Sequence, residues 1–124
     1  MEFKFDTKDT YTVITPLTDR LDVNLTEHLV SNIDVYTGGG CDNFIVDLHH
    51  CETADNTSFD ALVLLHQSCY GKQRSLVFTG LHPIVLQMLL ENDVVDLLNI
   101  APTMQEAIDI ISMEILERDL FNEE

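Results

Sequence analysis

The chain of 124 residues carries a formal net charge of −16, with six Lys and Arg residues against 22 Asp and Glu residues. Nucleic-acid phosphates and anionic membrane surfaces repel such an acidic protein, so neither is expected as a partner. A hydrophobic content of 45% in a chain of this length predicts one domain, residues 1–124, whose core needs neither disulfides nor a metal.

No apolar run reaches membrane-spanning length, and the first residues lack the layout of a signal peptide. We therefore expect a cytoplasmic protein without direct membrane insertion. Cys41, Cys51 and Cys69 form an odd set without a short C-x-x-C spacing, which fits a reducing compartment. Each of them is either a buried structural cysteine or a reactive thiol, and the sequence leaves both readings open.

Alternating apolar residues predict two short strands, Glu2–Asp6 and Tyr11–Thr15, joined by a turn at Lys8 and Asp9. Further on, Asn24 with Glu27 three residues later resembles a capping box, and apolar residues at helical spacing follow it. This helix is expected to end at the glycines of positions 38–40, and the next apolar run predicts a strand at 43–48.

A polar loop leads from that strand into a second helix, expected over Thr57–Tyr70 and ended by Gly71. The junction places hydroxyl side chains on the first turn of a helix, where free backbone amides and the helix dipole favour negative charge. A phosphate there would fit the helix and would add about two negative charges to an already acidic surface. Such a site suits a protein whose partners recognise whether it is modified.

The last part of the chain continues the alternation of strand and helix. Ser75–Thr79 predicts a buried strand, His82-Pro83 opens a helix, Leu97–Ile100 predicts a short strand, and Pro102-Thr103 opens the final helix. A frayed polar tail is expected from about residue 118 to Glu124. Alternating strands and helices predict an α/β domain with helices layered on a central sheet.

Four segments in this order resemble the signatures of the STAS family, the fold of anti-sigma factor antagonists. They are Asp19-Arg20-Leu21-Asp22, Asp55-Asn56-Thr57-Ser58-Phe59, Thr79-Gly80-Leu81-His82-Pro83-Ile84-Val85 and Thr103-Met104-Gln105-Glu106-Ala107. The second segment is similar to the family's D-S-S-G-L. The resemblance spans nearly the whole chain and implies a small mixed β-sheet flanked by about four α-helices.

The resemblance also implies a function. Members of the family bind proteins and are usually not enzymes, and many are phosphorylated by a kinase that is itself the anti-sigma factor. The acceptor position of the family, the second serine of D-S-S-G, falls on Thr57, and Asp55 matches the aspartate before it. Asn56 stands at the first serine and Ser58 at the glycine, so Thr57 and Ser58 are the two candidates for phosphorylation.

The residues expected to meet a partner lie in the first two of these segments or just after the first. They are Asp22, Asn24, Asp55, Asn56, Thr57, Ser58 and Phe59. Four of the polar ones also have a structural explanation: Thr57 as a helix cap, Asp55 as the acceptor of an Asx-type turn, and Asp22 or Asn24 as the cap of the first helix.

Two further patterns leave alternatives open. Asp47, His49, His50, Cys51, Glu52 and Asp55 are residue types that bind metals, but on a strand the two histidines would point to opposite faces, and no second pair of ligands follows. No metal, cofactor or catalytic residue is therefore expected. The second helix is apolar on two sides, either because both are buried or because one docks a partner.

We therefore expect an anti-sigma factor antagonist that docks on an anti-sigma factor through the unmodified Thr57 region, frees a sigma factor and is released on phosphorylation. The alternative is a STAS subunit that docks on a membrane transporter ATPase without phosphorylation. An enzyme built around His49 and Cys51 is a third hypothesis.

Overall fold

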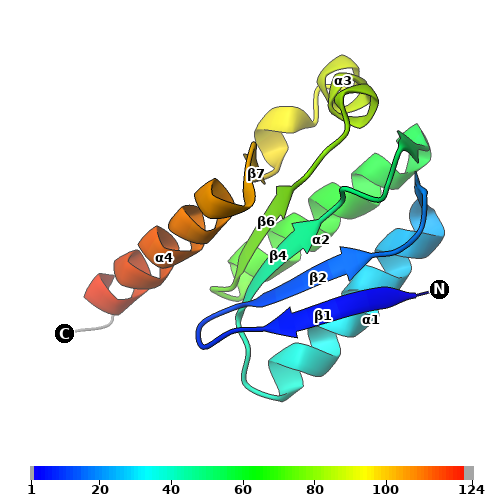
Figure 1. Ribbon diagram of the computed structural model, residues 1–124. Coiled ribbons are helices and arrows are strands. Elements are labelled where there is room, and N and C mark those ends of the chain that lie inside the picture. The colour runs from blue at the N-terminus through cyan, green and yellow to red at the C-terminus, as the bar shows by residue number, and fades with distance from the viewer. Residues whose placement is uncertain (1, 122–124) are drawn as a thin grey trace.

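The computed structural model describes residues 2–121 and shows a mixed α/β domain over this range (Figure 1). The central sheet has the strand order β1-β2-β4-β6-β7, with β1 at Phe3–Thr7, β2 at Thr12–Pro16, β4 at Asn43–Asp47, β6 at Ser75–Thr79 and β7 at Ile100–Ala101. The helices in these residues are α1 at Val23–Gly38, α2 at Phe59–Gly71, α3 at Pro83–Glu91 and α4 at Met104–Phe121. The mixed sheet with four helices confirms the expected architecture.

Strand β1 pairs antiparallel with β2 through a tight hairpin, and every other neighbouring pair in the sheet is parallel. The parallel strands β4 and β6 are buried on both faces, which explains their unbroken apolar runs. Because they run parallel, β2, β4 and β6 end at the same edge of the sheet. The loops that follow them are therefore neighbours in space.

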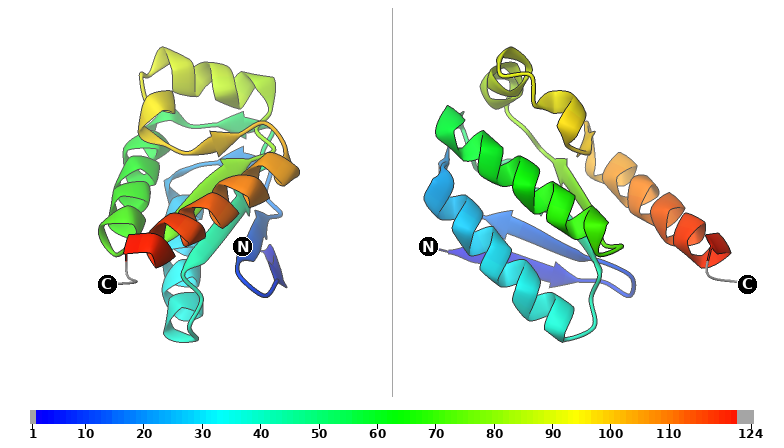
Figure 2. Two further views of the ribbon diagram at one scale, coloured as in Figure 1. Left: turned by 90° about the vertical axis from the view of Figure 1, so that its left-hand side faces the viewer. Right: turned by 180° about the vertical axis from the view of Figure 1, so that it is seen from behind.

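Side chains that alternate along the strands divide the core into two layers. Phe44 and Val46 of β4 join the larger cluster under α1 and α2, whereas Ile45 points to the opposite face. On that face Ile45 packs with Ala107 and Ile111 of α4. Figure 2 shows α1 and α2 on one side of the sheet and α4 on the other.

The first helix starts earlier than the sequence pattern predicts. Asp22, not Asn24, is its cap: the Asp22 backbone is extended, and its side chain accepts a hydrogen bond of 2.9 Å from the Leu25 amide. Glu27 then lies beyond the position that a capping box requires. Asn24 is an exposed residue of the first turn.

The final elements also differ from expectation. Leu97 belongs to a short 3-10 helix, Val95–Leu97, and the last strand is only Ile100–Ala101. Residues 118–121 of the predicted polar tail belong to α4, which continues to Phe121. Arg118 is held inward by hydrogen bonds to Ser75 Oγ and Asn43 Oδ1, which keeps the last turns of the helix against the sheet. The rest of the predicted tail, 122–124, lies outside the described residues.

Candidate partner-binding site

The loops after β2 and β4 meet beyond the sheet edge and form a second, two-stranded parallel sheet. It pairs β3, Arg20–Leu21, with β5, Thr53–Ala54, and α3 packs against β5. The carbonyl oxygen of Asp19 accepts from the Glu52 and Thr53 amides, and the Asp55 amide donates to Leu21 at 2.8 Å. No sequence pattern predicts this sheet, since two-residue strands leave no periodic signal.

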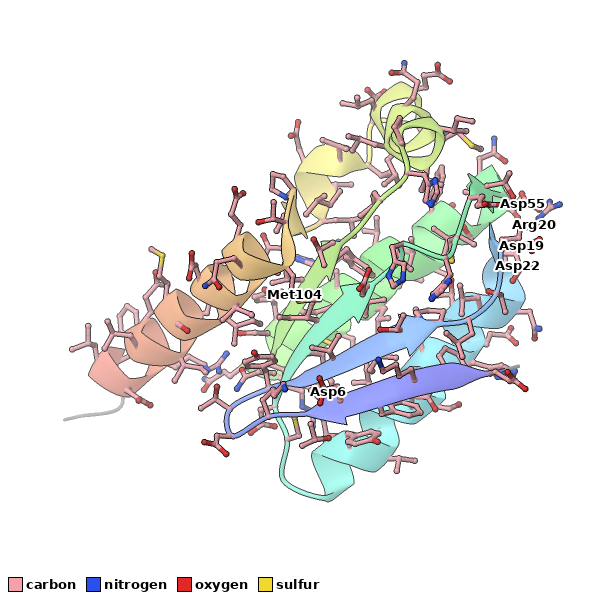
Figure 3. The ribbon with its side chains drawn as sticks, viewed as in Figure 1. Asp6, Asp19, Arg20, Asp22, Asp55 and Met104 are labelled. Carbon is pink, nitrogen blue, oxygen red and sulfur yellow. The ribbon has the colours of Figure 1, made fainter. Side chains whose placement is uncertain are left out.

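This small sheet brings the first two family-like segments into one corner of the molecule. Figure 3 shows Asp19, Arg20, Asp22 and Asp55 together there, far from Met104 at the start of α4. Arg20 Nη2 lies 3.2 Å from Asp55 Oδ2. Residues of two loops that are distant in the chain therefore contact each other at this corner.

Asp55 organises the turn that leads into α2. Its Oδ1 accepts hydrogen bonds from the Thr57 amide at 3.1 Å and from Thr57 Oγ1 at 2.9 Å. Asp55 thus caps the 3-10 helix Asn56–Ser58 that precedes α2, and Thr57 is not the cap. The Asp55 carboxylate instead fixes the direction of the Thr57 hydroxyl. Asp55 therefore both stabilises the turn and orients this hydroxyl.

These contacts favour the ionised form of Asp55. The backbone hydrogen bond from Thr57 lowers the pKa of the carboxyl most, followed by the Thr57 hydroxyl. Desolvation opposes them, and the hydrogen bond and charge of Arg20 lower the pKa by smaller amounts. The site therefore carries an ionised carboxylate directly beside the candidate phosphoacceptor at neutral pH.

The two candidate hydroxyls have opposite surroundings. Thr57 is exposed, whereas Ser58 is fully buried and donates a hydrogen bond of 2.7 Å to the Asp55 carbonyl oxygen. Phe59 is also buried, at 2% exposure, within the larger core cluster. Ser58 and Phe59 pack beneath the turn, inside the protein. The residues of the predicted partner-binding set that solvent can reach are Asp22, Asn24, Asp55, Asn56 and Thr57.

The histidine pair after β4 lies in a turn rather than on a strand. Its two rings lie side by side, with centroids 4.0 Å apart and planes tilted by 39°, instead of pointing to opposite faces. His49 Nδ1 lies 2.9 Å from Asp47 Oδ1. Cys51 is buried, and burial raises the pKa of its thiol to about 11, helped by the charges of Asp19 and Asp22. Within residues 2–121 no group of three metal-binding side chains converges.

Both apolar sides of α2 pack into the core. Leu62, Val63, Leu65 and Cys69 are buried, so neither predicted side remains as a free face. Leu64, on a third side, is exposed and borders a groove of about 260 Å³ between α1 and α2.

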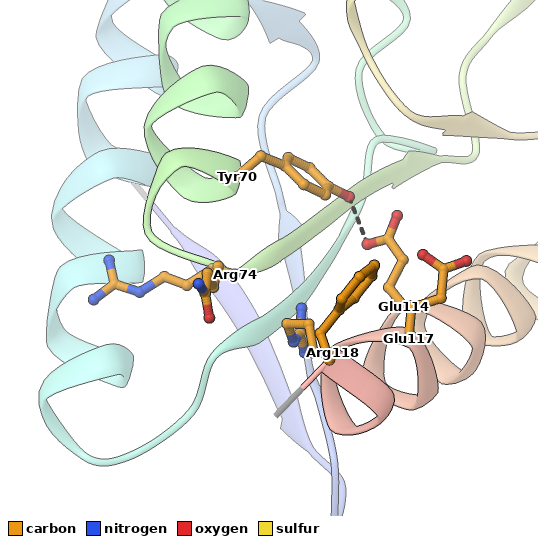
Figure 4. Close-up of a pocket in the computed structure, with 7 residues that line it drawn as sticks. Tyr70, Arg74, Glu114, Glu117 and Arg118 are labelled. Carbon is orange, nitrogen blue, oxygen red and sulfur yellow. Dashed lines mark hydrogen bonds between the residues drawn. The ribbon is translucent and has the colours of Figure 1, made fainter. Parts of the chain in front are cut away.

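A second polar cluster, which the sequence analysis missed, ties α2 to α4. Tyr70 Oη donates to Glu114 Oε1 at 2.7 Å, and Asn99 Nδ2 donates to both. Burial and the Glu114 hydrogen bond raise the pKa of Tyr70 above its usual range. Figure 4 shows Tyr70 and Glu114 beside a pocket of about 250 Å³ that Arg74, Glu117 and Arg118 also line. The partners are 15 to 44 positions apart, so no local sequence pattern joins them.

Comparison with known proteins assigns the family. The model of the STAS domain matches residues 4–107, which is most of the chain. The chain therefore belongs to the STAS domain family. No curated protein sequence matches it. The four segments that carried the resemblance lie inside the matched range.

Solved structures share the fold at low sequence identity. RsbS of Moorella thermoacetica, solved as a serine-to-glutamate variant, is 22% identical, with a TM-score of 0.70 over 95% of this chain and 99% of its own. A Thermotoga maritima protein described as a candidate anti-sigma factor antagonist is 16% identical, with a TM-score of 0.76 over 89% and 94%. The unphosphorylated anti-sigma factor antagonist SpoIIAA, a Bacillus protein, is 16% identical, with a TM-score of 0.67 over 90% and 96%.

None of the helices in residues 2–121 has both the length and the apolar character needed to cross a membrane.

Proposed function

We propose that this chain is a cytoplasmic, reversible protein-binding module that acts as an anti-sigma factor antagonist and is switched by phosphorylation of Thr57. One observation carries the proposal: the exposed Thr57 hydroxyl is held by Asp55 at the start of α2, while the neighbouring Ser58 hydroxyl is buried. A kinase needs access to its acceptor, so of these two only Thr57 meets that requirement in this conformation. The similar protein SpoIIAA has been solved in unphosphorylated and phosphorylated forms.

Phosphorylation would change the corner in two ways. The Thr57 oxygen would lose the proton that it now donates to Asp55, and about −1.5 to −2 charge would appear next to that carboxylate. Arg20 is the cation already paired with Asp55, so the phosphate would compete for it. The turn would then lose the hydroxyl contact to Asp55, together with the Arg20 contact where the phosphate captures that cation, and would keep the contact from the Thr57 amide.

The partner would sense both changes. A surface packed closely against the Thr57 hydroxyl has no room for three phosphate oxygens, and a phosphate left unpaired in an interface is costly to desolvate. Exposed Asp19, Glu52 and Asp60 make the same corner acidic, so the docking face of the anti-sigma factor is expected to be basic.

The test is affinity capture from the native cell on the wild-type chain and on the Thr57→Val, Thr57→Ser and Ser58→Ala variants. The proposal predicts one main partner with kinase activity, which phosphorylates wild type, Thr57→Ser and Ser58→Ala but not Thr57→Val. Transporter ATPase subunits as main partners, with unmodified Thr57, would support the alternative docking function instead. Phosphate that disappears in Ser58→Ala and persists in Thr57→Val would refute Thr57 as the acceptor.

A further inference from the structure

Helix α4 carries an apolar stripe on the side that faces away from the sheet. Met113, Leu116 and Leu120 are 63%, 60% and 61% exposed, respectively. They recur at positions i, i+3 and i+7, so they lie on one face of the helix. The residues of α4 that enter the core, Ala107 and Ile111, lie on the opposite side. We call Met113, Leu116 and Leu120 the outer stripe.

The outer stripe is unusual for this protein. Other large apolar side chains that are at least half exposed are Val35 on α1, Leu64 on α2, Ile84 and Leu90 on α3, and Phe121 at the end of α4, and no three of them share one helix face. Single exposed apolar residues are ordinary on protein surfaces, whereas three in register on one helix mark a surface that another molecule covers. Anchors at i, i+3 and i+7 are also the spacing with which one helix packs against another.

The charged residues beside the outer stripe indicate which kind of molecule would cover it. Asp109, Glu117 and Asp119 are exposed along α4, and within residues 2–121 none of them pairs with a cation. The single cation in the sequence of α4, Arg118, is turned inward to Ser75 and Asn43. The outer stripe is therefore an apolar surface flanked by carboxylates that have no cationic partner in the described part of the chain.

We propose that the outer stripe docks an amphipathic helix of a protein partner whose apolar face is flanked by Lys and Arg. Leucine-like side chains would cover the stripe, and the long cationic side chains beside them would reach Glu117 and Asp119. A second copy of this chain would set the same acidic residues against each other. An anionic membrane surface would meet the same repulsion.

The outer stripe and Thr57 are separate surfaces. The stripe lies on α4, on one side of the sheet, and Thr57 lies at the start of α2, whose core packing is on the other side (Figure 2). The stripe also lies outside residues 4–107, the range that the family model matches. Binding at the stripe is therefore a property of this chain that does not depend on the Thr57 switch.

The test uses a fluorescent synthetic peptide of Leu-Lys-Lys-Leu-Leu-Lys-Leu heptads and its counterpart with Glu in place of each Lys, with binding followed by anisotropy. The stripe variant is Met113→Ser with Leu116→Ser and Leu120→Ser. Its matched control is Val35→Ser with Leu64→Ser and Ile84→Ser, which removes three exposed apolar side chains elsewhere. A second variant, Glu117→Lys with Asp119→Lys, keeps the stripe and reverses its charge.

We expect wild type, the matched control and Thr57→Asp to bind the Lys peptide equally, and the stripe variant to bind at least about tenfold more weakly. The charge-reversed variant should lose affinity for the Lys peptide and gain it for the Glu peptide. Equal binding of the Lys peptide by the stripe variant would show general attraction to an acidic protein and overturn the proposal. A wild-type dimer in sedimentation that the stripe variant abolishes would assign the stripe to a second copy and also overturn it.

Discussion

Arg20 and Asp55 lie 35 positions apart in the chain, yet Arg20 Nη2 is 3.2 Å from Asp55 Oδ2. The pair closes the corner formed by the loops after β2 and β4, and it leaves the other Asp55 oxygen to hold Thr57. One carboxylate therefore links the first family-like segment to the second.

The pKa of Asp55 should lie below that of an ordinary aspartate. Thr57→Val removes the hydroxyl bond and Arg20→Ala removes the cation, so each should raise the pKa toward its usual range while the Thr57 amide still keeps it low. Carbon-13 NMR titration of the carboxyl measures this directly. An unchanged pKa in both variants would show that the side-chain contacts do not form in solution.

The same shift has a consequence for acid stability. Since the folded pKa is below the unfolded value, the carboxylate stabilises the fold above the unfolded pKa, and this contribution is lost as the pH falls through the folded pKa. Asp55→Asn should therefore unfold with less dependence on pH in that acidic window. Denaturant unfolding at several pH values tests this, and an unaltered pH dependence would contradict it.

Gly80 is a position where a side chain cannot be accommodated. Its φ is +74°, and a Cβ there would clash with Asp47 Oδ1 and come within 3.1 Å of the His49 amide. Gly80→Ala should therefore lower the free energy of unfolding by about 1–3 kcal/mol, measured by urea denaturation.

Gly71→Ala is the matched control for this substitution. A Cβ at Gly71 would meet no atom within 4 Å, so the free energy of unfolding should stay the same or rise by up to about 1 kcal/mol. Equal losses at Gly71 and Gly80 would show that the loss of a glycine, rather than the positive φ and the close contacts at position 80, causes the destabilisation.

Arg118 should hold the last turns of α4 to the sheet. Arg118→Met removes the hydrogen bonds to Ser75 and Asn43 and leaves two buried acceptors without that donor, at a cost of about 1–3 kcal/mol. Hydrogen exchange should accelerate in the second half of α4 and little elsewhere. Lys72→Met, at an exposed cation, should change neither, and uniform acceleration throughout the protein would contradict a local role.

The thiols should differ in reactivity. Burial raises the pKa of Cys51 to about 11 and also raises that of Cys69, so both should resist a thiol reagent at neutral pH until the protein unfolds. Cys41 is only half-buried and should react first. Fast labelling of Cys51 in the folded protein would contradict this prediction and would support the hypothesis of an enzyme built around His49 and Cys51.

Much of the fold follows from sequence periodicity. The strand at Ser75–Thr79 is observed with its predicted bounds, because a fully buried apolar run has few alternatives. Asp22 shows where such reasoning fails: both Asp22 and Asn24 suit a cap, and the choice depends on the β3–β5 pairing that holds the preceding residue extended. Arg118 is similar, since a polar helix end is indistinguishable from a frayed tail until its partners are known.

The candidate site, too, could be predicted from the sequence only in part. The family-like segments located Asp55 and Thr57, but no pattern tells which of two adjacent hydroxyls is exposed. Ser58 is buried because its side chain turns back to the Asp55 carbonyl, a contact that exists only once the 3-10 turn has formed. The outer stripe of α4 was not predicted, because helical spacing marks only the apolar face that packs on the sheet, and Leu120 falls within the expected polar tail.

The most direct measurement of the central claim is the affinity of the captured anti-sigma factor for wild type, Thr57→Val, Thr57→Asp and the Thr57-phosphorylated protein, by titration calorimetry. We predict that wild type and Thr57→Val bind alike, because neither carries charge at the site. Thr57→Asp and the phosphorylated protein should bind at least about tenfold more weakly. Equal affinity in all four forms would contradict the phosphorylation switch.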